Sequence, residues 1–330
     1  MTILVTGGAG YIGSHMVLEL RDAGEDVVVL DNLSTGFAWA VPDDVRLVIG
    51  DVGDQALVQR LISQHHIDAI IHFAGSIIVP ESVENPLHYY RNNTSNTRNL
   101  IECAVTGGVR NFIFSSTAAV YGNPVENPVS ETARLQPVSP YGWSKLMSEV
   151  MLADTAAAHD FNYVALRYFN VAGADPQGRT GQSTPNATHL IKVACETALG
   201  RRAAMQVFGT DYPTRDGTCI RDYIHVKDLA MAHMAVLGYL RNGGKSEVFN
   251  CGYSQGFSVS EVVTAVKKVS GIDFEARLAE RRPGDPAAIV AASDKIRARL
   301  QWTPAHDDLE GIVRNALDWE QRLSLMKEVC

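Results

Sequence analysis

Continuous apolar runs alternate with longer amphipathic stretches through the first half of the chain. The apolar runs predict strands over residues 2–6, 27–31, 46–50, 69–74, 111–116 and 163–169. The stretches between them predict helices over residues 11–23, 54–65, 85–106 and 141–159. Runs without polar alternation are typical of parallel strands that are buried on both faces. The pattern therefore predicts an α/β fold, a doubly wound parallel sheet with right-handed crossovers.

The pattern changes after the sixth predicted strand, where residues 171–188 are rich in Gly, Pro, Thr and Asn. This composition indicates a loop and a domain boundary, which gives a first domain of 1–170 and a smaller α/β substrate domain of 171–330. The segment near 220–252 is expected to return to the first domain, because residues 247–250 look like a further sheet strand. The other predicted elements are helices over 189–199 and 259–270, a helix ending near 241, two terminal helices, and strands over 205–208, 221–225 and 273–278.

A glycine-rich turn follows the first predicted strand and opens the first predicted helix. Gly8, Gly10 and Gly13 fit the spacing G-x-G-x-x-G. If the pattern starts one residue earlier, at Gly7, the same two later glycines fit G-x-x-G-x-x-G. Glycine permits the dihedrals of a tight turn, and a bare backbone lets a pyrophosphate approach closely. The free N–H groups and the dipole of the helix N-terminus favour the same anion, so the turn predicts a dinucleotide site.

An acidic residue ends the second predicted strand, where Asp31 lies eighteen residues past Gly13. An acid here accepts a hydrogen bond from the ribose 2′-hydroxyl and repels a 2′-phosphate, which favours NAD over NADP. The alternative is an aspartate that only begins the turn over residues 31–34. Asp51, at the end of the third strand, could accept from the adenine amino group, cap the helix near residue 54, or do both. The first domain is therefore predicted to be an NAD-binding domain of the Rossmann type.

Tyr141 and Lys145 lie four positions apart at the start of the helix between the fifth and sixth strands, so they share one helix face. An ammonium about 4 Å from a phenolate stabilises it by ~4 kcal/mol at an effective dielectric of 20. This energy would bring the pKa of Tyr141 from its ordinary value toward neutrality, and bound NAD would act in the same direction. Such a tyrosine can remove a hydroxyl proton while a hydride leaves for the nicotinamide. The plainer interpretation is a charged pair on a surface helix.

Thr117 ends the fifth predicted strand and is expected to face the helix that carries Tyr141. Its hydroxyl can form a hydrogen bond with the reacting oxygen and share its proton. Ser116 would then point to the other face of the sheet, because side chains alternate along a strand. The alternative is a threonine that only helps to form the turn. Thr117, Tyr141 and Lys145 are the predicted catalytic residues.

These motifs resemble those of a known family. Thr6–His15, Tyr141–Lys145 and Leu166–Asn170 are similar to the motifs of extended short-chain dehydrogenase/reductases. More narrowly, Asp211–Val226 and Arg281–Asp285 resemble segments of the UDP-glucose 4-epimerases. The likeness runs along nearly the whole chain, and the motifs of the second domain are the specific ones.

The resemblance implies an isomerase that uses tightly bound NAD to interconvert UDP-glucose and UDP-galactose. Tyr141 would take the proton of the hexose 4-hydroxyl while hydride passes from carbon 4 to NAD. The 4-keto sugar would then turn over and receive the hydride on its other face. Lys145 would lower the pKa of Tyr141 and hold the nicotinamide ribose. The implied cofactor contacts are Gly7, Gly10, Tyr11, Ile12, Gly13, Asp31, Asn32, Asp51, Val52, Phe73, Ala74, Gly75, Asn92, Tyr141, Lys145 and Tyr168.

The resemblance also implies contacts to the UDP-sugar. Asn170 and Arg221 would hold the nucleotide sugar, and Phe208 would lie beside the uracil. Arg282 would meet phosphate and Asp285 the uridine ribose, which suits the bidentate geometry of arginine with phosphate. The full set of implied substrate contacts is Thr117, Tyr141, Asn170, His189, Phe208, Arg221, Arg282 and Asp285.

Three positions depart from the family pattern. Ile77 lies in the stretch where many relatives have a lysine near the cofactor phosphates. His189 stands where many relatives have an asparagine that contacts the substrate. Ile289 stands where relatives have a tyrosine or a smaller residue beside the sugar, so acceptance of N-acetylated sugars is left open.

Several rival functions share most of these residues. Nucleotide-sugar 4,6-dehydratases and related decarboxylases carry acidic residues after the catalytic threonine, whereas this chain has Ala118 and Ala119. Alanine cannot give or take a proton, which counts against both classes. UDP-uronate and UDP-pentose 4-epimerases would use the same catalytic residues and stay open. From a different class, a non-catalytic dinucleotide sensor is disfavoured by the intact Tyr141 and Lys145.

Composition and charge limit the kinds of binding partner and the cellular location that we expect. The 330 residues suit two domains, and a net charge of −8 argues against nucleic acid. The chain begins with a strand in place of a secretory signal and has no apolar run of transmembrane length, so neither export nor a membrane is expected. Cysteines without a C-x-x-C pair indicate reduced thiols in the cytoplasm. No metal is expected, because His65-His66 lacks ligand-spaced partners. The family resemblance suggests a homodimer through the helices at 85–106 and 141–159.

Overall fold

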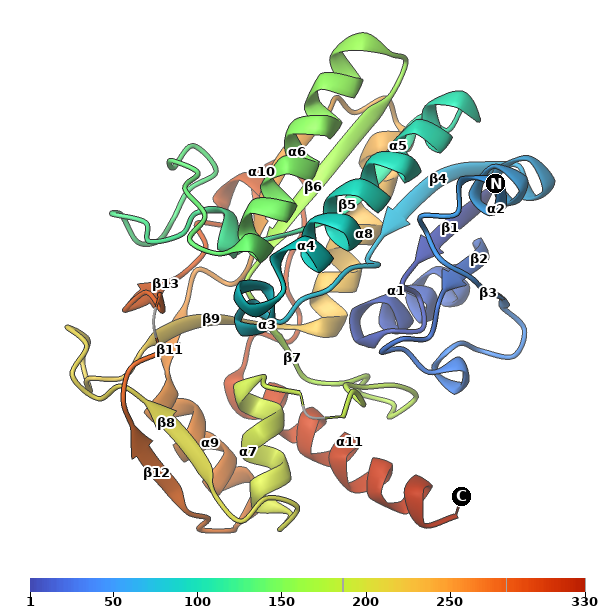
Figure 1. Cartoon of the computed structure of the whole chain (residues 1–330). Coiled ribbons are helices and arrows are strands. Elements are labelled where there is room, and N and C mark those ends of the chain that lie inside the picture. The colour runs from blue at the N-terminus through green and yellow to red at the C-terminus, as the bar shows by residue number, and fades with distance from the viewer. Residues whose placement is uncertain (186, 283, 330) are drawn as a thin grey trace.

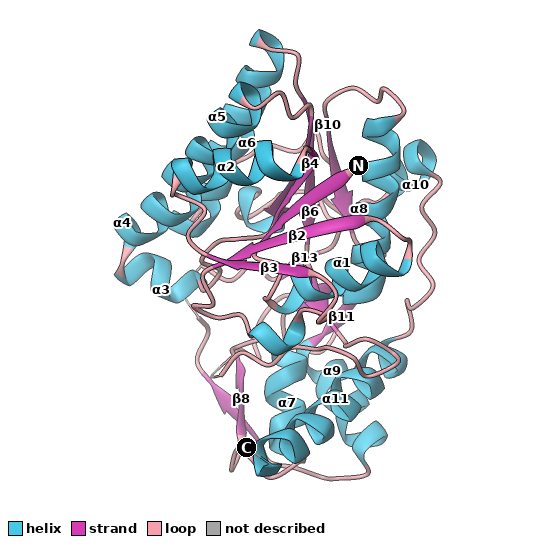
Figure 2. Cartoon of the chain, turned by 90° about the vertical axis from the view of Figure 1, so that its right-hand side faces the viewer, coloured by secondary structure: helices cyan, strands magenta, loops and turns pink. Residues whose placement is uncertain are grey.

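Seven parallel strands form the central sheet of the computed structural model, which describes residues 1–185, 187–282 and 284–329. Their order is β10-β6-β5-β4-β1-β2-β3, and every pair is parallel (Figure 2). The strands are β1 (Thr2–Thr6), β2 (Asp26–Asp31), β3 (Arg46–Ile49), β4 (Ile67–His72), β5 (Asn111–Thr117), β6 (Asn162–Tyr168) and β10 (Glu247–Cys251). The chain order reverses between β1 and β4, which confirms the doubly wound sheet and places a ligand crevice at that point.

Helices cover both faces of the sheet (Figure 1). One layer contains α2 (Gln55–His65), α5 (Asn96–Thr106) and α6 (Pro140–Ala158), and the other contains α1 (Tyr11–Asp22) and α8 (Val226–Arg241). Alternation along β1 decides which layer each residue meets. Ile3 and Val5 belong to the core cluster under α1 and α8, and Leu4 belongs to the cluster under α2 and α5. The apolar run of β1 is continuous because both of its faces are buried.

The helix predicted over residues 85–106 is interrupted in the structure, so that prediction was wrong in detail. It consists of α4 (Pro86–Tyr89), a π-helical turn (Tyr90–Ser95) and α5. A further helix, α3 (Val79–Glu84), precedes it and was not predicted. The π turn widens the helix, and the side chain of Asn93 leaves this turn to accept a hydrogen bond from Ser76 N at 2.7 Å.

The second half of the chain contributes to both parts of the molecule. The predicted strand over 247–250 is β10, which pairs with β6 in the large sheet, and α8 packs against α1. A second sheet contains β7 (Asn170–Ala172), β9 (Ile220–His225), β11 (Gly256–Ser258) and β13 (Ala288–Ile289). β8 (Met205–Phe208) pairs with β12 (Ala276–Ala279), which starts three residues later than predicted. The remaining helices are α7 (Leu190–Ala198), α9 (Val259–Ser270), α10 (Asp294–Leu300) and α11 (Leu309–Val329).

The sheets meet at the carboxyl end of β6. The chain passes from β6 through one residue into β7, and β7 pairs with β9. Below the large sheet, α7, α9 and α11 pack together (Figure 2). The carboxyl end of β6 therefore leads directly to β7 and β9 of the second sheet.

Two further predictions concern thiols and membranes. Cys103, Cys195, Cys219 and Cys251 are buried free thiols, and Cys330 lies outside the described residues. No helix in the described part of the chain combines the length and the apolar character that crossing a bilayer requires.

Candidate active site

The glycine turn between β1 and α1 is tightly packed, and its glycines differ in how much space surrounds them. Gly7 has φ +72°, and a Cβ atom there would lie 2.6 Å from Ala74 N. A Cβ atom at Gly13 would lie 2.1 Å from the main-chain oxygen of Gly7. At Gly10 the added atom would meet only that oxygen, at 3.3 Å. Gly7 and Gly13 therefore seat α1 against the turn, while Gly10 leaves bare backbone where α1 begins, at Tyr11 and Ile12, and this fits a pyrophosphate.

Asp31 ends β2 with a buried carboxylate that is held by the main chain. Oδ2 accepts from Ala9 N at 2.9 Å, and Oδ1 accepts from Leu33 N at 2.8 Å. The carboxylate thus joins the end of β2 to the glycine turn and also forms the turn proposed as its alternative role. Each oxygen has further lone pairs, so this carboxylate fits a ribose hydroxyl as well.

Asp51 is placed beside Asn32 at the ends of β3 and β2. Asn32 Nδ2 donates to Asp51 Oδ2 at 3.1 Å, and Gly53 N donates to Oδ1 at 2.8 Å. The helix cap is a different residue, because Asp54 accepts from the first turn of α2 at 3.0 Å. The alternative in which Asp51 caps α2 is therefore wrong. Val52 is buried and supports this turn from the core.

The end of β4 approaches Lys145. A Cβ atom at Gly75 would lie 3.6 Å from Lys145 Nζ and 3.1 Å from Asn93 Oδ1, so a side chain here would crowd the Asn93 amide and lie against the ammonium. Phe73 packs with its ring centroid 4.9 Å from that of His233, and Ala74 adjoins the glycine turn.

The residues after Gly75 show which contacts the π turn supplies. Asn92 Nδ2 donates to Ser76 Oγ at 2.9 Å. Ile77 is 53% exposed and offers an apolar side chain where a lysine was expected from the family pattern. The sequence analysis did not predict Asn93 as a site residue. Its side-chain amide donates to both Ser76 O and Ser144 Oγ. Its burial at the irregular turn was not visible in the hydrophobic pattern.

Tyr141 and Lys145 lie on the first two turns of α6, which is capped by Ser139. Lys145 Nζ donates to the main-chain oxygen of Ser115 at 2.9 Å. Burial raises the pKa of Tyr141, and the hydrogen bond with Thr117 lowers it. The ammonium of Lys145 is directed to the carbonyl of Ser115, and its role in lowering the pKa of Tyr141 stays a prediction. Burial itself lowers the pKa of Lys145 to about 8.

Thr117 reaches Tyr141 and also caps a short 3₁₀ helix over Ala118–Val120, accepting from Ala119 N at 3.1 Å. The interpretation as a residue that helps to form the turn is therefore confirmed, and the catalytic role of its hydroxyl stays a prediction. The orientation expected for Ser116 was wrong, because its hydroxyl bonds to Glu149 on α6. The first turn of α6 extends beyond the sheet edge, so the last residue of β5 meets Tyr141 while Ser116 faces the body of the helix.

Tyr168 and Asn170 line the crossing from β6 to β7. The Tyr168 hydroxyl is hydrogen bonded to Ser115 Oγ, a partner that the sequence analysis missed. Asn170 Nδ2 donates to Asp222 O at 3.2 Å. Side chains alternate between the two faces of β5, and this alternation could have indicated that Ser115 meets Tyr168.

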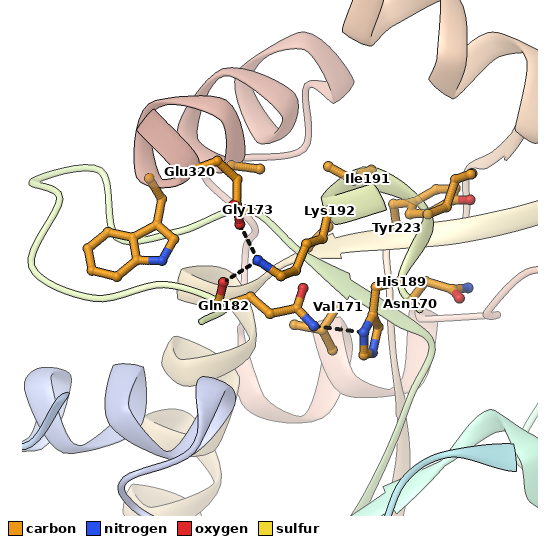
Figure 3. A pocket seen from close by; sticks show the side chains of 13 residues that line it. Asn170, Val171, Gly173, Gln182, His189, Ile191, Lys192, Tyr223 and Glu320 are labelled. Carbon is orange, nitrogen blue, oxygen red and sulfur yellow. Dashed lines mark hydrogen bonds and ion pairs between the residues drawn. The ribbon is translucent and has the colours of Figure 1, made fainter. Parts of the chain in front are cut away.

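Asn170 and His189 border a cavity between β7, α7 and α11 (Figure 3). His189 precedes α7, with Nδ1 2.7 Å from Gln182 Nε2, and burial lowers its pKa. Deeper in the cavity, Lys192 pairs with Glu320 (Figure 3). Gln182 was not predicted, because its loop has no periodic pattern that would place it beside His189.

The nucleotide contacts implied by the resemblance come together as two pairs. The guanidinium carbon of Arg282 lies 3.8 Å from the centroid of the Phe208 ring. Arg221 Nη2 lies 3.7 Å from Asp285 Oδ1. Pro283, in the turn between these partners, lies outside the described residues. The arrangement combines an aromatic face, two guanidinium groups and a carboxylate, which suits a base, a pyrophosphate and a ribose.

The comparisons with known proteins agree with this geometry. The model of the NAD dependent epimerase/dehydratase family matches residues 3–252. The chain belongs to this family. NAD is its cofactor, and the bare backbone at Gly10 and the buried Asp31 carboxylate fit this dinucleotide.

The alignments with curated relatives and solved structures extend over nearly the whole chain. The protein is 58% identical to UDP-glucose 4-epimerase of Azospirillum brasilense over 97% of this chain and 92% of the relative. The crystal structure of UDP-glucose 4-epimerase from Brucella ovis in complex with NAD has a TM-score of 0.94 and 42% identity, covering 96% and 97% of the two chains. The UDP-Glc/GlcNAc 4-epimerase of Campylobacter jejuni has a TM-score of 0.86 and 51% identity, covering 97% and 99%.

Proposed function

We propose that this enzyme interconverts UDP-glucose and UDP-galactose by inverting carbon 4 through a 4-keto intermediate. The observation that carries the proposal is that Tyr141 and Lys145 on α6 meet Thr117 and Ser115 on β5, in a chain that also has a dinucleotide turn and the Phe208–Arg282 pair. The alanines after Thr117 supply no acid or base for elimination of water, which favours epimerisation over dehydration. The 58% identical relative named UDP-glucose 4-epimerase supports the same activity.

In this proposal Tyr141 is the general base, and its phenolic oxygen takes the proton of the sugar hydroxyl. Thr117, whose hydroxyl is bonded to Tyr141, orients that hydroxyl and shares its proton. Bound NAD supplies a hydride acceptor that returns the hydride within the same turnover. Lys145 donates to Ser115 O on β5 and lies beside Gly75, and from there it would hold the nicotinamide ribose.

The nucleotide half of the substrate supplies the binding energy in this mechanism. Phe208 and Arg282 would hold the uracil and a phosphate, and Arg221 with Asp285 the other phosphate and the uridine ribose. Asn170 and His189 border the place left for the hexose. A sugar that must turn over between two hydride transfers cannot be held firmly, so tight contacts belong to the UDP and loose ones to the hexose.

The test is conversion without added oxidant or reductant. Purified enzyme is incubated with UDP-galactose and with UDP-glucuronate and UDP-arabinopyranose as separate substrates, and the carbon-4 epimers are separated chromatographically. UDP-galactose labelled with deuterium at carbon 4 should keep the label at carbon 4 of the product. Loss of the label to solvent, or no turnover of any UDP-sugar, would exclude the proposal, and the second result would favour a dinucleotide sensor.

A second substrate class is favoured by one position. Ile289 packs in a small apolar cluster with Ala118 and Phe169, and it is paired with Arg221 along β13 and β9. Isoleucine takes less space beside the sugar than a tyrosine would, which favours acceptance of UDP-N-acetylglucosamine. The relative from Campylobacter jejuni, 51% identical, is named for both substrates. The ratio of kcat/KM for the two sugars, in the native enzyme and in Ile289→Tyr, tests this role.

We further propose a cytoplasmic homodimer. Trp143, Met147 and Val150 project from one face of α6 with 41%, 41% and 52% of their surface exposed. Leu87 on α4, which packs against α6, is 79% exposed. A contiguous apolar face on two neighbouring helices suits a helix-to-helix contact between two copies. The buried free thiols support a reducing compartment.

A further inference from the structure

A buried ion pair joins α6 to β6. The helix α6 packs on β5 and β6 of the large sheet (Figure 1). Arg167 Nε lies 3.0 Å from Glu149 Oε1, and Nη2 lies 2.5 Å from Oε2. The two side chains are 4% and 6% exposed. Ser116 Oγ donates to the same carboxylate. A bidentate pair with a third donor has one well-defined geometry, so it determines how α6 sits on the sheet.

The other end of the guanidinium is also fully engaged. Arg167 Nη1 donates to Tyr121 Oη at 3.0 Å and to Glu131 O at 3.4 Å. Tyr121 Oη in turn donates to Asn250 Oδ1, on β10, at 2.6 Å. The pair is therefore the centre of a network that joins α6 to β5, β6 and β10. Nothing in the proposed mechanism uses this network directly.

Glu149 follows Lys145 by four positions, on the same face of α6. Burial lowers the pKa of Lys145, and the charge of Glu149 raises it. Of the other groups around the ammonium, His72 on β4 is neutral because burial lowers its pKa to about 3. From β5 the ammonium meets Ser115 O and the ring of Phe114, at 4.9 Å from the centroid. Glu149 is thus the carboxylate that acts on Lys145 within the described part of the chain.

We propose that Glu149, gripped by Arg167, is a positioning residue for Tyr141 and Lys145. It sets the depth and rotation of α6 on the sheet, and it supplies the negative charge that keeps Lys145 an ammonium in a buried site. Both effects act through α6, without contact between Glu149 and the substrate. This inference rests on the proposed function, because it concerns the same tyrosine and lysine.

The test compares Glu149→Gln with the double variant Glu149→Gln/Arg167→Met. The single variant leaves a buried guanidinium without its carboxylate and is expected to lose stability. The double variant removes both charges and keeps an apolar side chain of similar length, so it leaves no unpaired charge in the core. Glu149 is the group whose charge raises the pKa of Lys145, so the loss of its carboxylate is expected to outweigh the loss of the guanidinium there. Ser116→Ala is the matched control, because it removes one hydrogen bond from Glu149 and leaves all charges in place.

The measurements are kcat and KM for UDP-galactose against pH, with bound NAD and thermal unfolding recorded for each variant. We expect the double variant to lose roughly 10- to 100-fold in kcat, the scale of a small misplacement of catalytic groups. Its KM should stay within about twofold, since the UDP contacts are made elsewhere. The alkaline limb of kcat should move to lower pH, because an ammonium without a nearby carboxylate deprotonates more easily.

Ser116→Ala should keep the alkaline limb where it lies in the native enzyme. A double variant that binds NAD and has native kcat and an unmoved alkaline limb would overturn the inference. A double variant that unfolds at a lower temperature but keeps the native kcat and pH profile would also overturn the inference. An ion pair with a purely structural role would change the stability and leave the pH profile unchanged. Failure of the native enzyme to epimerise any UDP-sugar is a different result, and it refutes the proposed function.

Discussion

Replacing Asp31 separates two tasks that its carboxylate performs at the end of β2. In the structure it accepts from Ala9 N at 2.9 Å and Leu33 N at 2.8 Å, and in the proposed complex it also accepts from the adenosine ribose. Asp31→Ala removes every acceptor, and Asp31→Asn keeps the size and one acceptor oxygen but removes the charge. The pair of variants therefore distinguishes hydrogen bonds to the turn from repulsion of a 2′-phosphate.

The magnitudes follow from these contacts. A hydrogen bond to a charged group contributes about 1.5 kcal/mol at the low end, so losing two lowers the free energy of unfolding of Asp31→Ala by roughly 3 kcal/mol. Asp31→Asn should lose about half of that. A doubly charged phosphate about 4 Å from a carboxylate is repelled by ~2 kcal/mol even at the dielectric of water. Removing the charge should therefore lower the ratio of the NADP to the NAD dissociation constant by roughly 30-fold.

Both quantities are measured on enzyme stripped of cofactor. Urea unfolding gives the change in stability, and calorimetric titration with NAD and with NADP gives the ratio of dissociation constants. An unchanged ratio in Asp31→Asn, with the expected loss of stability, would refute the ribose role and leave Asp31 as a residue of the turn. Unchanged stability in Asp31→Ala would show that the two main-chain contacts contribute nothing.

Three further predictions follow from single contacts. Tyr141→Phe should lower kcat by ~10²–10⁴ through loss of the general base while keeping NAD and UDP binding, and near-native kcat would remove Tyr141 as the base. Gly13→Ala places a methyl group 2.1 Å from Gly7 O and should displace α1, so the enzyme should purify without NAD. Gly238→Ala, with no atom within 4 Å of the added group, is its control and should keep the cofactor. Trp143→Glu should give a monomer in sedimentation velocity, and an unchanged mass would place the interface elsewhere.

Interrupted elements show where hydrophobic patterning stops being informative. The inner strands of the large sheet, such as β1 and β5, were predictable because their apolar runs are buried on both faces. The pairing of β10 with β6 agrees with the predicted return of the chain. The π turn at Tyr90–Ser95 was not predictable from the sequence. Its polar residues show no hydrophobic periodicity, and its side-chain hydrogen bonds reach a loop that is distant in sequence. Asn93 and Gln182 were not predicted for the same reason, because their positions depend on contacts outside their own segments.

What the sequence alone determined is what local chemistry dictates: the glycine turn, the acid at the end of β2, the Tyr141–Lys145 spacing and the family. Only the tertiary structure decided which atoms these groups meet. It directed Lys145 to Ser115 O and not to Tyr141, placed Ser116 against Glu149, and made Asp54 the cap of α2. Spacing along a helix or strand sets which face a side chain occupies, but burial and hydrogen-bond partners depend on how separate elements pack.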